Sequence, residues 1–157
     1  MAKRILLAVD NSKNSLKAVK YVAGTVNKDA RVTMLSILPD PTAGCGLDSP
    51  ALAPIFKENI KAFCTIEQAK KAAVEGFLQE AKKILVKGGF ASKNVAVRIR
   101  KKKAGIARDI LKEAERGKYD TIVIGRRGLT GIKQFLFGSV SNKVVQLAQK
   151  ASVIVVD

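Results

Sequence analysis

The segment G125-R-R-G-L-T-G-I-K-Q-F-L-F-G-S-V-S-N142 combines residue types that hold anionic groups. Gly125, Gly128 and Gly131 permit positive φ and let a ligand approach bare main chain, and successive amides in such a turn can form a concave anion site. Gly138 and Ser139 open an apolar pattern with helical spacing, and the first amides of a helix are unpaired and lie at the positive end of its dipole. The chemistry predicted for this segment is therefore the binding of phosphate groups. The alternative is a structural glycine-rich turn capped by Ser139.

The spacing of the glycines differs from that of the better-known phosphate loops. A Walker A motif, G-x-x-x-x-G-K-[ST], does not occur in the chain. The first expected strand is followed by Asp10-Asn11-Ser12, where a dinucleotide fingerprint would have G-x-G-x-x-G. The glycines alone therefore leave the ligand unidentified.

The rest of the chain alternates apolar strands with amphipathic helices. Strands are expected over residues 5–9, 31–38, 95–99, 119–124 and 153–156, with a helical pattern after each of the first four. This order predicts an α/β fold with one doubly wound, five-stranded parallel sheet and helices on both faces. Ligands of such sheets bind beyond the carboxyl ends of the strands. The glycine segment follows the fourth strand and so lies at the expected binding edge.

Residues 1–157 are expected to form one domain, because no internal repeat or second core pattern is visible. An irregular connection over about residues 39–58 holds all four prolines and precedes a long amphipathic helix. The apolar stripe of that helix is expected to face the core and not a cofactor.

The composition excludes several classes of protein. The chain has no histidine, which removes Ser/His and Cys/His catalytic pairs and the commonest imidazole metal sites. No apolar run approaches the ~20 residues that span a bilayer, and the basic start lacks a long apolar region and a cleavage site. Cys45 and Cys64 are expected to be free thiols, with a disulfide as the less favoured alternative. These features together predict a cytoplasmic protein.

The charge balance is strongly basic, with 29 Lys and Arg against 13 Asp and Glu and a net charge of +16. A field of this sign attracts polyanions such as nucleic acid, nucleotides and anionic lipid headgroups. The densest run is Arg98-Ile99-Arg100-Lys101-Lys102-Lys103. A solvated strand end is the favoured interpretation of this run, and a phosphate-contacting patch is the alternative.

Taken with the rest of the chain, the glycine spacing resembles that of the universal stress protein family, in its ATP-binding branch. That branch carries G-x2-G-x9-G-[ST], and here the pattern is Gly125-x2-Gly128-x9-Gly138-Ser139. The resemblance also covers the opening ILLAVDNS, the DTIVIG run that ends at Gly125, and the closing VIVV. It implies a sheet of strand order 3-2-1-4-5 with an adenine nucleotide α-hydrolase-like fold. It also implies a role in the stress response and binding of ATP, or of ADP or AMP.

By family position, the resemblance implies a nucleotide site assembled from several strand ends and the start of the last helix. Main chain and small side chains would hold the phosphates and ribose, and apolar strand-end residues would contact the adenosine. The residues implied are Ala8, Val9, Asp10, Ile37, Ile124, Gly125, Arg127, Gly128, Gly138, Ser139, Val140 and Ser141.

The resemblance further implies a homodimer formed through the last strand, over residues 152–156. Two positions depart from the family pattern. The last strand follows Ala151-Ser152 where a Cys-Pro pair is usual, and Arg126 stands where Ser or Thr is frequent. An arginine at position 126 can reach a phosphate bidentately or point outward, and the outward orientation is expected.

The residues near the expected site offer few groups that could support fast catalysis. ATP hydrolysis needs an oriented water and usually a metal, yet Asp10 is the single carboxylate in reach, with Ser139 and Ser141 as hydroxyls beside a Mg²⁺ or Mn²⁺ ion. Asp10 has a structural alternative, as a cap of the first helix. The sequence thus predicts a nucleotide-binding sensor or regulator with at most slow ATP hydrolysis. The alternatives are a nucleotide-free dimeric interaction module and a basic-surface binder of nucleic acid, which is not favoured because no aromatic residue interleaves the basic run.

Overall fold

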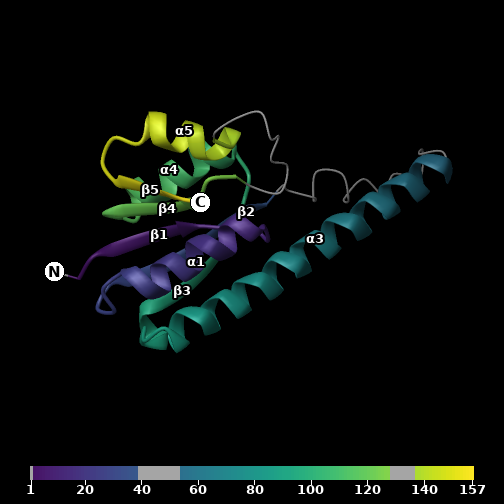
Figure 1. The fold of residues 1–157 in the computed structure, drawn as a ribbon. Coiled ribbons are helices and arrows are strands. Elements are labelled where there is room, and N and C mark those ends of the chain that lie inside the picture. The colour runs from purple at the N-terminus through teal and green to yellow at the C-terminus, as the bar shows by residue number, and fades with distance from the viewer. Residues whose placement is uncertain (1, 39–53, 128–136) are drawn as a thin grey trace.

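A computed structural model describes residues 2–38, 54–127 and 137–157 of the chain. These residues form a central sheet with helices on both of its faces (Figure 1). The strands are β1 (Arg4–Ala8), β2 (Arg31–Leu38), β3 (Val95–Lys101), β4 (Thr121–Gly125) and β5 (Ser152–Val156). The helices are α1 (Lys13–Thr25), α3 (Pro54–Lys87), α4 (Ile106–Arg116) and α5 (Ser139–Leu147), with a single 3₁₀ turn, η1 (Ser92–Asn94).

The sheet has the order β3-β2-β1-β4-β5, and every neighbouring pair of strands is parallel. The predicted fold class and strand order are therefore confirmed. The chain moves outward from β1 through β2 to β3 and then crosses to β4 on the other side of β1. The order reverses between β1 and β4, and ligands of doubly wound sheets bind beyond the carboxyl ends of the strands at such a point.

Alternation along the strands divides the core into two layers. Ile5 and Leu7 of β1 point to the face covered by α1 and α3, and Leu6 and Ala8 point to the face covered by α4 and α5. Successive side chains of a strand point to opposite faces, so a strand buried on both sides is a continuous apolar run. The sequence RILLA of β1 fits this requirement, with all four residues after Arg4 buried.

Helix α3 is anchored to the sheet through its carboxyl-terminal half. Val74, Leu78, Ala81 and Leu85 are buried and recur at helical spacing on the side that joins the core of the α1 face. The other half of the helix extends beyond the sheet (Figure 1). The helix ends at Gly88-Gly89, as predicted, and Gly89 has a φ of +105°, a conformation that favours glycine.

Two expectations differ from the structure. Helix α3 begins at Pro54, so its first residues overlap the irregular connection expected to about residue 58. Proline is well suited to the first turn of a helix, where its missing N–H would have no partner. Cys64 is disulfide-bonded, so the expectation of free thiols is wrong for this residue, while Cys45 lies outside the described residues. Sequence separation does not reveal whether two cysteines approach within bonding distance.

No helix in the described part of the chain is both long enough and apolar enough to cross a membrane. The long α3 is amphipathic, and its exposed side carries charged pairs such as Lys83 with Glu80.

Candidate functional site

The carboxyl ends of β1 and β4 bring together several of the residues implied by the family resemblance. Ala8 and Ile124 are direct register partners across the two strands. Ala8, Ile124 and Ile37, near the end of β2, are all buried in the core layer of the α4 and α5 face. Val9 is buried on the opposite face, and its N–H donates to the carbonyl of Leu35, which continues the β1–β2 pairing.

Asp10 organises the turn between β1 and α1. Its Oδ1 accepts hydrogen bonds from the N–H of Ser12 at 2.9 Å and from the Oγ of Ser15 at 2.8 Å. The Asp10 N–H in turn donates to the Ser15 Oγ at 2.9 Å. Ser12 is the N-cap of α1 and accepts from the N–H of Ser15. Asp10 is thus tied into the start of α1 through one carboxylate oxygen, and Oδ2 accepts no hydrogen bond from the described residues.

Gly125 is required by packing between β4 and α1. A Cβ atom at this position would lie 2.8 Å from the main-chain carbonyl carbon and oxygen of Asn14. Gly125 is not in the positive-φ region, which among the described glycines is occupied by Gly89 and Gly105. Gly125 therefore does not adopt the positive-φ conformation expected of it. Its close packing against Asn14 instead requires a residue without a side chain. Asn14 was not among the expected site residues, because nothing in the sequence around it indicates its contact with Gly125.

Arg126 and Gly138 join the two ends of the glycine segment. The carbonyl of Arg126 accepts from the Gly138 N–H at 2.8 Å and from the Ser141 Oγ at 2.7 Å. The Arg126 N–H donates to the carbonyl of Val156 at 2.7 Å, so the same residue also continues the β4–β5 pairing. Ser141 is 2% exposed, and its hydroxyl is committed to these main-chain contacts.

The side chain of Arg126 is paired within the protein. Its Nη2 lies 2.8 Å from the Oδ1 of Asp157, and 31% of the side chain is exposed. The outward orientation expected for this arginine therefore does not describe its position, because its charge is held beside the end of β5. Neither Arg126 nor Asp157 was among the expected site residues. An arginine in place of the usual small hydroxyl was the one signal that pointed to this position.

The amino terminus of α5 faces the same edge with its main chain open. Gly138 is the N-cap, with φ −68° and ψ 159°, and the described residues provide no side-chain cap. The first hydrogen bond of the helix runs from the Asn142 N–H to the Gly138 carbonyl. The amides of Ser139, Val140 and Ser141 therefore precede the ladder of the helix, at the positive end of its dipole. Such an end can take an anionic group without any cationic side chain.

The remaining expected site residues fall in different places. Ser139 is exposed and Val140 is partly buried, both in the first turn of α5. Arg127 is partly buried and directly follows Arg126. Gly128 lies outside the described residues, and so does Gly131 of the same segment.

A cavity of about 480 Å³ lies at the amino ends of the strands, away from this site. Tyr119 and Asp120 before β4 line it, together with residues of α4 and the connection from α5 to β5. The cavity lies where the carboxyl-terminal ends of α4 and α5 pack near the amino end of β4. The volume of this cavity does not identify it as the binding site, because the first amides of α5 and the reversal of strand order both lie at the carboxyl edge of the sheet.

The described residues contain no group of three or more His, Cys, Asp or Glu side chains that could hold a metal ion. Asp10 is the carboxylate at this edge that could contribute to binding one, and hard cations such as Mg²⁺ usually take one or two carboxylates together with substrate phosphates. The residues thus suit an ion carried in by a polyphosphate better than a resident metal.

Asp109 holds the loop that leaves the carboxyl end of β3. Its two carboxylate oxygens accept from the N–H groups of Lys103 at 2.7 Å and Ala104 at 3.1 Å. Slight desolvation acts to raise the pKa of this carboxyl, but hydrogen bonds from the main chain of residues 103–105 outweigh it and hold the pKa below its ordinary value. The ionised form is therefore favoured in the folded protein.

Replacing Asp109 with asparagine is expected to lower stability above about pH 4, the ordinary pKa range of aspartate. A lowered folded-state pKa contributes stability that is present above the unfolded-state pKa and lost as pH falls through the folded-state value. The difference at neutral pH should be at most about 1 kcal/mol, because water screens a partly exposed carboxylate. Urea unfolding of both proteins from pH 2 to 7 measures it. Curves that stay equally far apart across the whole range would show that Asp109 acts by shape and not by charge.

The fold and the edge described above define a class: a doubly wound α/β domain with an open helix terminus at the point where strand order reverses. The chain belongs to the universal stress protein family, whose model matches residues 1–157. Universal stress protein MJ0531 of Methanocaldococcus jannaschii is 28% identical over 147 residues, which cover 93% of this chain and 77% of that protein. The solved structure of the protein MJ0577 is similar with a TM-score of 0.68 and 26% identity, covering 99% of this chain and 96% of that one.

More distant solved structures share the fold and were determined with adenine nucleotides. A universal stress protein of Archaeoglobus fulgidus in complex with dAMP has a TM-score of 0.63 and 17% identity, covering 100% of this chain and 98% of that one. A universal stress protein in complex with cAMP has a TM-score of 0.61 and 22% identity, covering 99% and 96%. A family protein of Arabidopsis thaliana with AMP bound has a TM-score of 0.58 and 16% identity, covering 98% and 90%.

Proposed function

We propose that this universal stress protein binds an adenine nucleotide, ATP in the first place, at the carboxyl edge of β1 and β4. The observation that carries the proposal is the uncapped amino terminus of α5, held against the end of β4 by the contacts of Gly138 and Ser141 with the Arg126 carbonyl. Amides in the first turn of α5 that have no hydrogen-bond partner among the described residues, together with the positive end of the helix dipole, favour phosphate oxygens. Relatives solved with AMP, dAMP or cAMP support an adenine nucleotide as the ligand.

In this proposal the residues divide between the two parts of the nucleotide. The main-chain amides of Ser139 and Val140 hold the phosphates beside Gly138, whose own N–H is bonded to Arg126, with Gly128 contributing from the segment that the structure leaves undescribed. Ile37 and Ile124 border the adenosine, together with Ala8, Val9 and Asp10 at the end of β1. Asp10 keeps Oδ2 for the ligand or for a Mg²⁺ or Mn²⁺ ion that accompanies it, because its Oδ1 already binds the start of α1.

The protein acts in this proposal as a sensor or regulator of the stress response, with at most slow ATP hydrolysis. Asp10 is the one carboxylate among the proposed site residues, so this set offers no second carboxylate to orient an attacking water. We also propose a homodimer through β5, whose residues after Ser152 remain only partly buried when β4 is the strand's one partner. A cytoplasmic location belongs to the same proposal. The disulfide of Cys64 counts against it, since disulfides are rare in reducing compartments.

Ligand retention tests the nucleotide proposal directly. Protein purified gently and then denatured should release ATP, ADP or AMP, detected by mass spectrometry. Calorimetric titration of nucleotide-stripped protein should then show binding of ATP and much weaker binding of GTP, because the apolar strand-end residues are expected to contact the base. Protein that releases no nucleotide and gives no heat with any adenine nucleotide would overturn the proposal and favour the nucleotide-free interaction module.

A further inference from the structure

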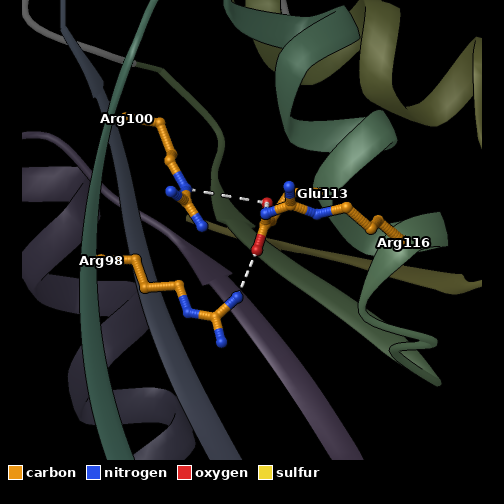
Figure 2. A network of polar contacts seen from close by, with 4 residues as sticks. All are labelled: Arg98, Arg100, Glu113 and Arg116. Carbon is orange, nitrogen blue, oxygen red and sulfur yellow. Dashed lines mark hydrogen bonds and ion pairs between the residues drawn. The ribbon is translucent and has the colours of Figure 1, made fainter.

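Three arginines converge on one buried carboxylate between β3 and α4. The side chain of Glu113 is 6% exposed, and its Oε1 lies 2.5 Å from the Nη1 of Arg98. Its Oε2 lies 2.8 Å from the Nη2 of Arg116 and 3.9 Å from the Nε of Arg100. Arg98 and Arg100 leave β3 on the same side and reach toward Glu113, beside which Arg116 of α4 also lies (Figure 2). We call these four residues the arginine cluster.

One function of the cluster is structural, because it ties the edge strand β3 to α4. A carboxylate removed from water needs paired charges and hydrogen bonds, and Glu113 receives them from two guanidinium groups at hydrogen-bond distance. This role accounts for the burial of Glu113. It does not account for the number of cations, because two guanidinium groups already satisfy both oxygens and Arg100 is only at ion-pair distance.

The cluster carries two positive charges more than Glu113 neutralises. Each guanidinium has five N–H donors and spends few of them on the carboxylate. The side chains remain accessible, with 40% of Arg98, 48% of Arg100 and 65% of Arg116 exposed. Their positions are already restrained by Glu113, so an incoming anion pays little of the entropy of ordering them. Excess charge, open donors and restraint are the features that an anion-binding surface requires.

The basic run continues from the cluster along the end of β3. The strand pairs with β2 as far as Lys101, and the Lys102 N–H still donates to the Leu38 carbonyl at 2.7 Å. Strand residues two apart lie on the same face about 6.6 Å from each other. Arg98 and Arg100 therefore repeat on one face at a spacing suited to a ligand that repeats its negative charge, and Lys101, Lys102 and Lys103 follow them, all exposed.

The surroundings favour a nucleic acid over a protein as the partner. Protein interfaces are built around buried aromatic and aliphatic anchors. The large exposed apolar side chains of the described residues lie mainly on α3 and α5, and the one on α4, Ile106, stands two helical turns from Glu113. A surface of cations without apolar anchors matches recognition of a phosphodiester backbone, which carries most of its affinity through Lys and Arg.

We propose that the arginine cluster, with Lys102 and Lys103 beyond the end of β3, is a docking surface for the phosphodiester backbone of double-stranded nucleic acid. Binding is independent of base sequence, because nothing in the cluster is placed to read base edges and no aromatic residue interleaves the basic run. The surface adjoins the proposed nucleotide site at one point, since Arg100 is the register partner of Ile37, but β2 and β1 stand between β3 and β4, beside whose end lies the terminus of α5 assigned to the phosphates. The proposal does not depend on ATP binding.

Fluorescence anisotropy with a labelled 20-base-pair DNA duplex of mixed sequence, from 50 to 200 mM salt, tests this proposal. The double variant Arg100→Gln/Arg116→Gln removes two cations and leaves Arg98 paired with Glu113. It should bind the duplex at least about tenfold more weakly at low salt and reduce the slope of log K against log salt by about 2, one for each lost phosphate contact. If the double variant shows no thermal unfolding transition and is therefore not folded, the single variant Arg100→Gln replaces it. This variant removes the most weakly held arginine and should reduce the slope by about 1.

The matched control is Lys17→Gln/Lys20→Gln, which removes the same charge from exposed positions of α1 on the other face of the sheet. It should change duplex affinity by no more than about threefold. An equal loss in the control would assign binding to the general field of the protein and overturn the site. Failure of the wild-type protein to bind the duplex, or tighter binding of poly-glutamate that depends on the same arginines, would overturn the choice of partner. Titration of the same variants with ATP distinguishes this surface from the proposed nucleotide site, because the phosphates are assigned to α5 and ATP affinity should fall by much less than duplex affinity.

Discussion

Replacing Gly138 with leucine should abolish ATP binding, with a loss of affinity of about 100-fold or more. A Cβ at this position would lie 3.2 Å from the Arg126 carbonyl oxygen and 3.3 Å from the Arg127 Cα, so the rest of a leucine side chain must turn outward over the start of α5. There it would occupy the space in front of the free amides that the proposal assigns to phosphate. Isothermal titration of the variant with ATP measures the effect.

The fold should survive this substitution. Gly138 has φ −68° and ψ 159°, a conformation open to any residue, so a side chain adds no φ/ψ strain, and the main chain of Arg126 and Arg127 has to give way by only a few tenths of an ångström. The control is Gly76→Leu on α3, where a Cβ meets no atom within 4 Å; it should leave ATP affinity unchanged and raise stability slightly by improving helix propensity. If Gly138→Leu binds ATP as well as Gly76→Leu does, the phosphates lie elsewhere and the assignment of α5 fails.

Replacing Leu78 with alanine should cost about 2 to 5 kcal/mol of the free energy of unfolding. Leu78 is fully buried in the core layer between α3 and the sheet, where it is the middle of the stripe that anchors the helix. Truncation removes its apolar contacts and leaves a cavity, because neighbours held by β-strands relax only partly. Urea unfolding followed by circular dichroism measures the change in midpoint at constant slope.

Ile66→Ala on the same helix is the comparison for this experiment. The Ile66 side chain is 54% exposed, so the substitution should change the free energy of unfolding by no more than about 0.5 kcal/mol. Similar losses for the two variants would mean that the amino-terminal half of α3 also packs against the protein. Nearly native stability of Leu78→Ala would mean that α3 contributes little to the core, contrary to its buried stripe.

Element order and fold class were predictable from sequence because their signals are local. Hydrophobic period and turn residues placed each strand to within two residues of its observed ends, and the apolar stripe of α3 faces the core as expected. The limits of local signals show at β3, which was expected to end at Ile99 but continues to Lys101. The apolar alternation stops there, whereas main-chain pairing of Arg100 with Ile37 and of Lys101 with Leu38 does not depend on side-chain type.

Several roles at the candidate site could not be predicted from sequence. Gly125 was expected to offer conformational freedom, yet its position is set by Asn14 of α1, 111 residues earlier in a chain of 157 residues. Arg126 was expected to point outward, but Asp157 holds it at the end of β5. These contacts join residues that are remote in the chain, and residue type alone carries no record of such a neighbour.

Residue types and their spacing established the α/β class, the family and the glycine pattern before α5, because periodicity and motif spacing are properties of consecutive residues. Only the folded chain revealed that the described residues leave the amino terminus of α5 uncapped beside β4 and that Arg98, Arg100 and Arg116 share Glu113. The physical reason is that a charge or an open amide acquires its role from the groups packed around it, and strand order, not chain order, selects those groups.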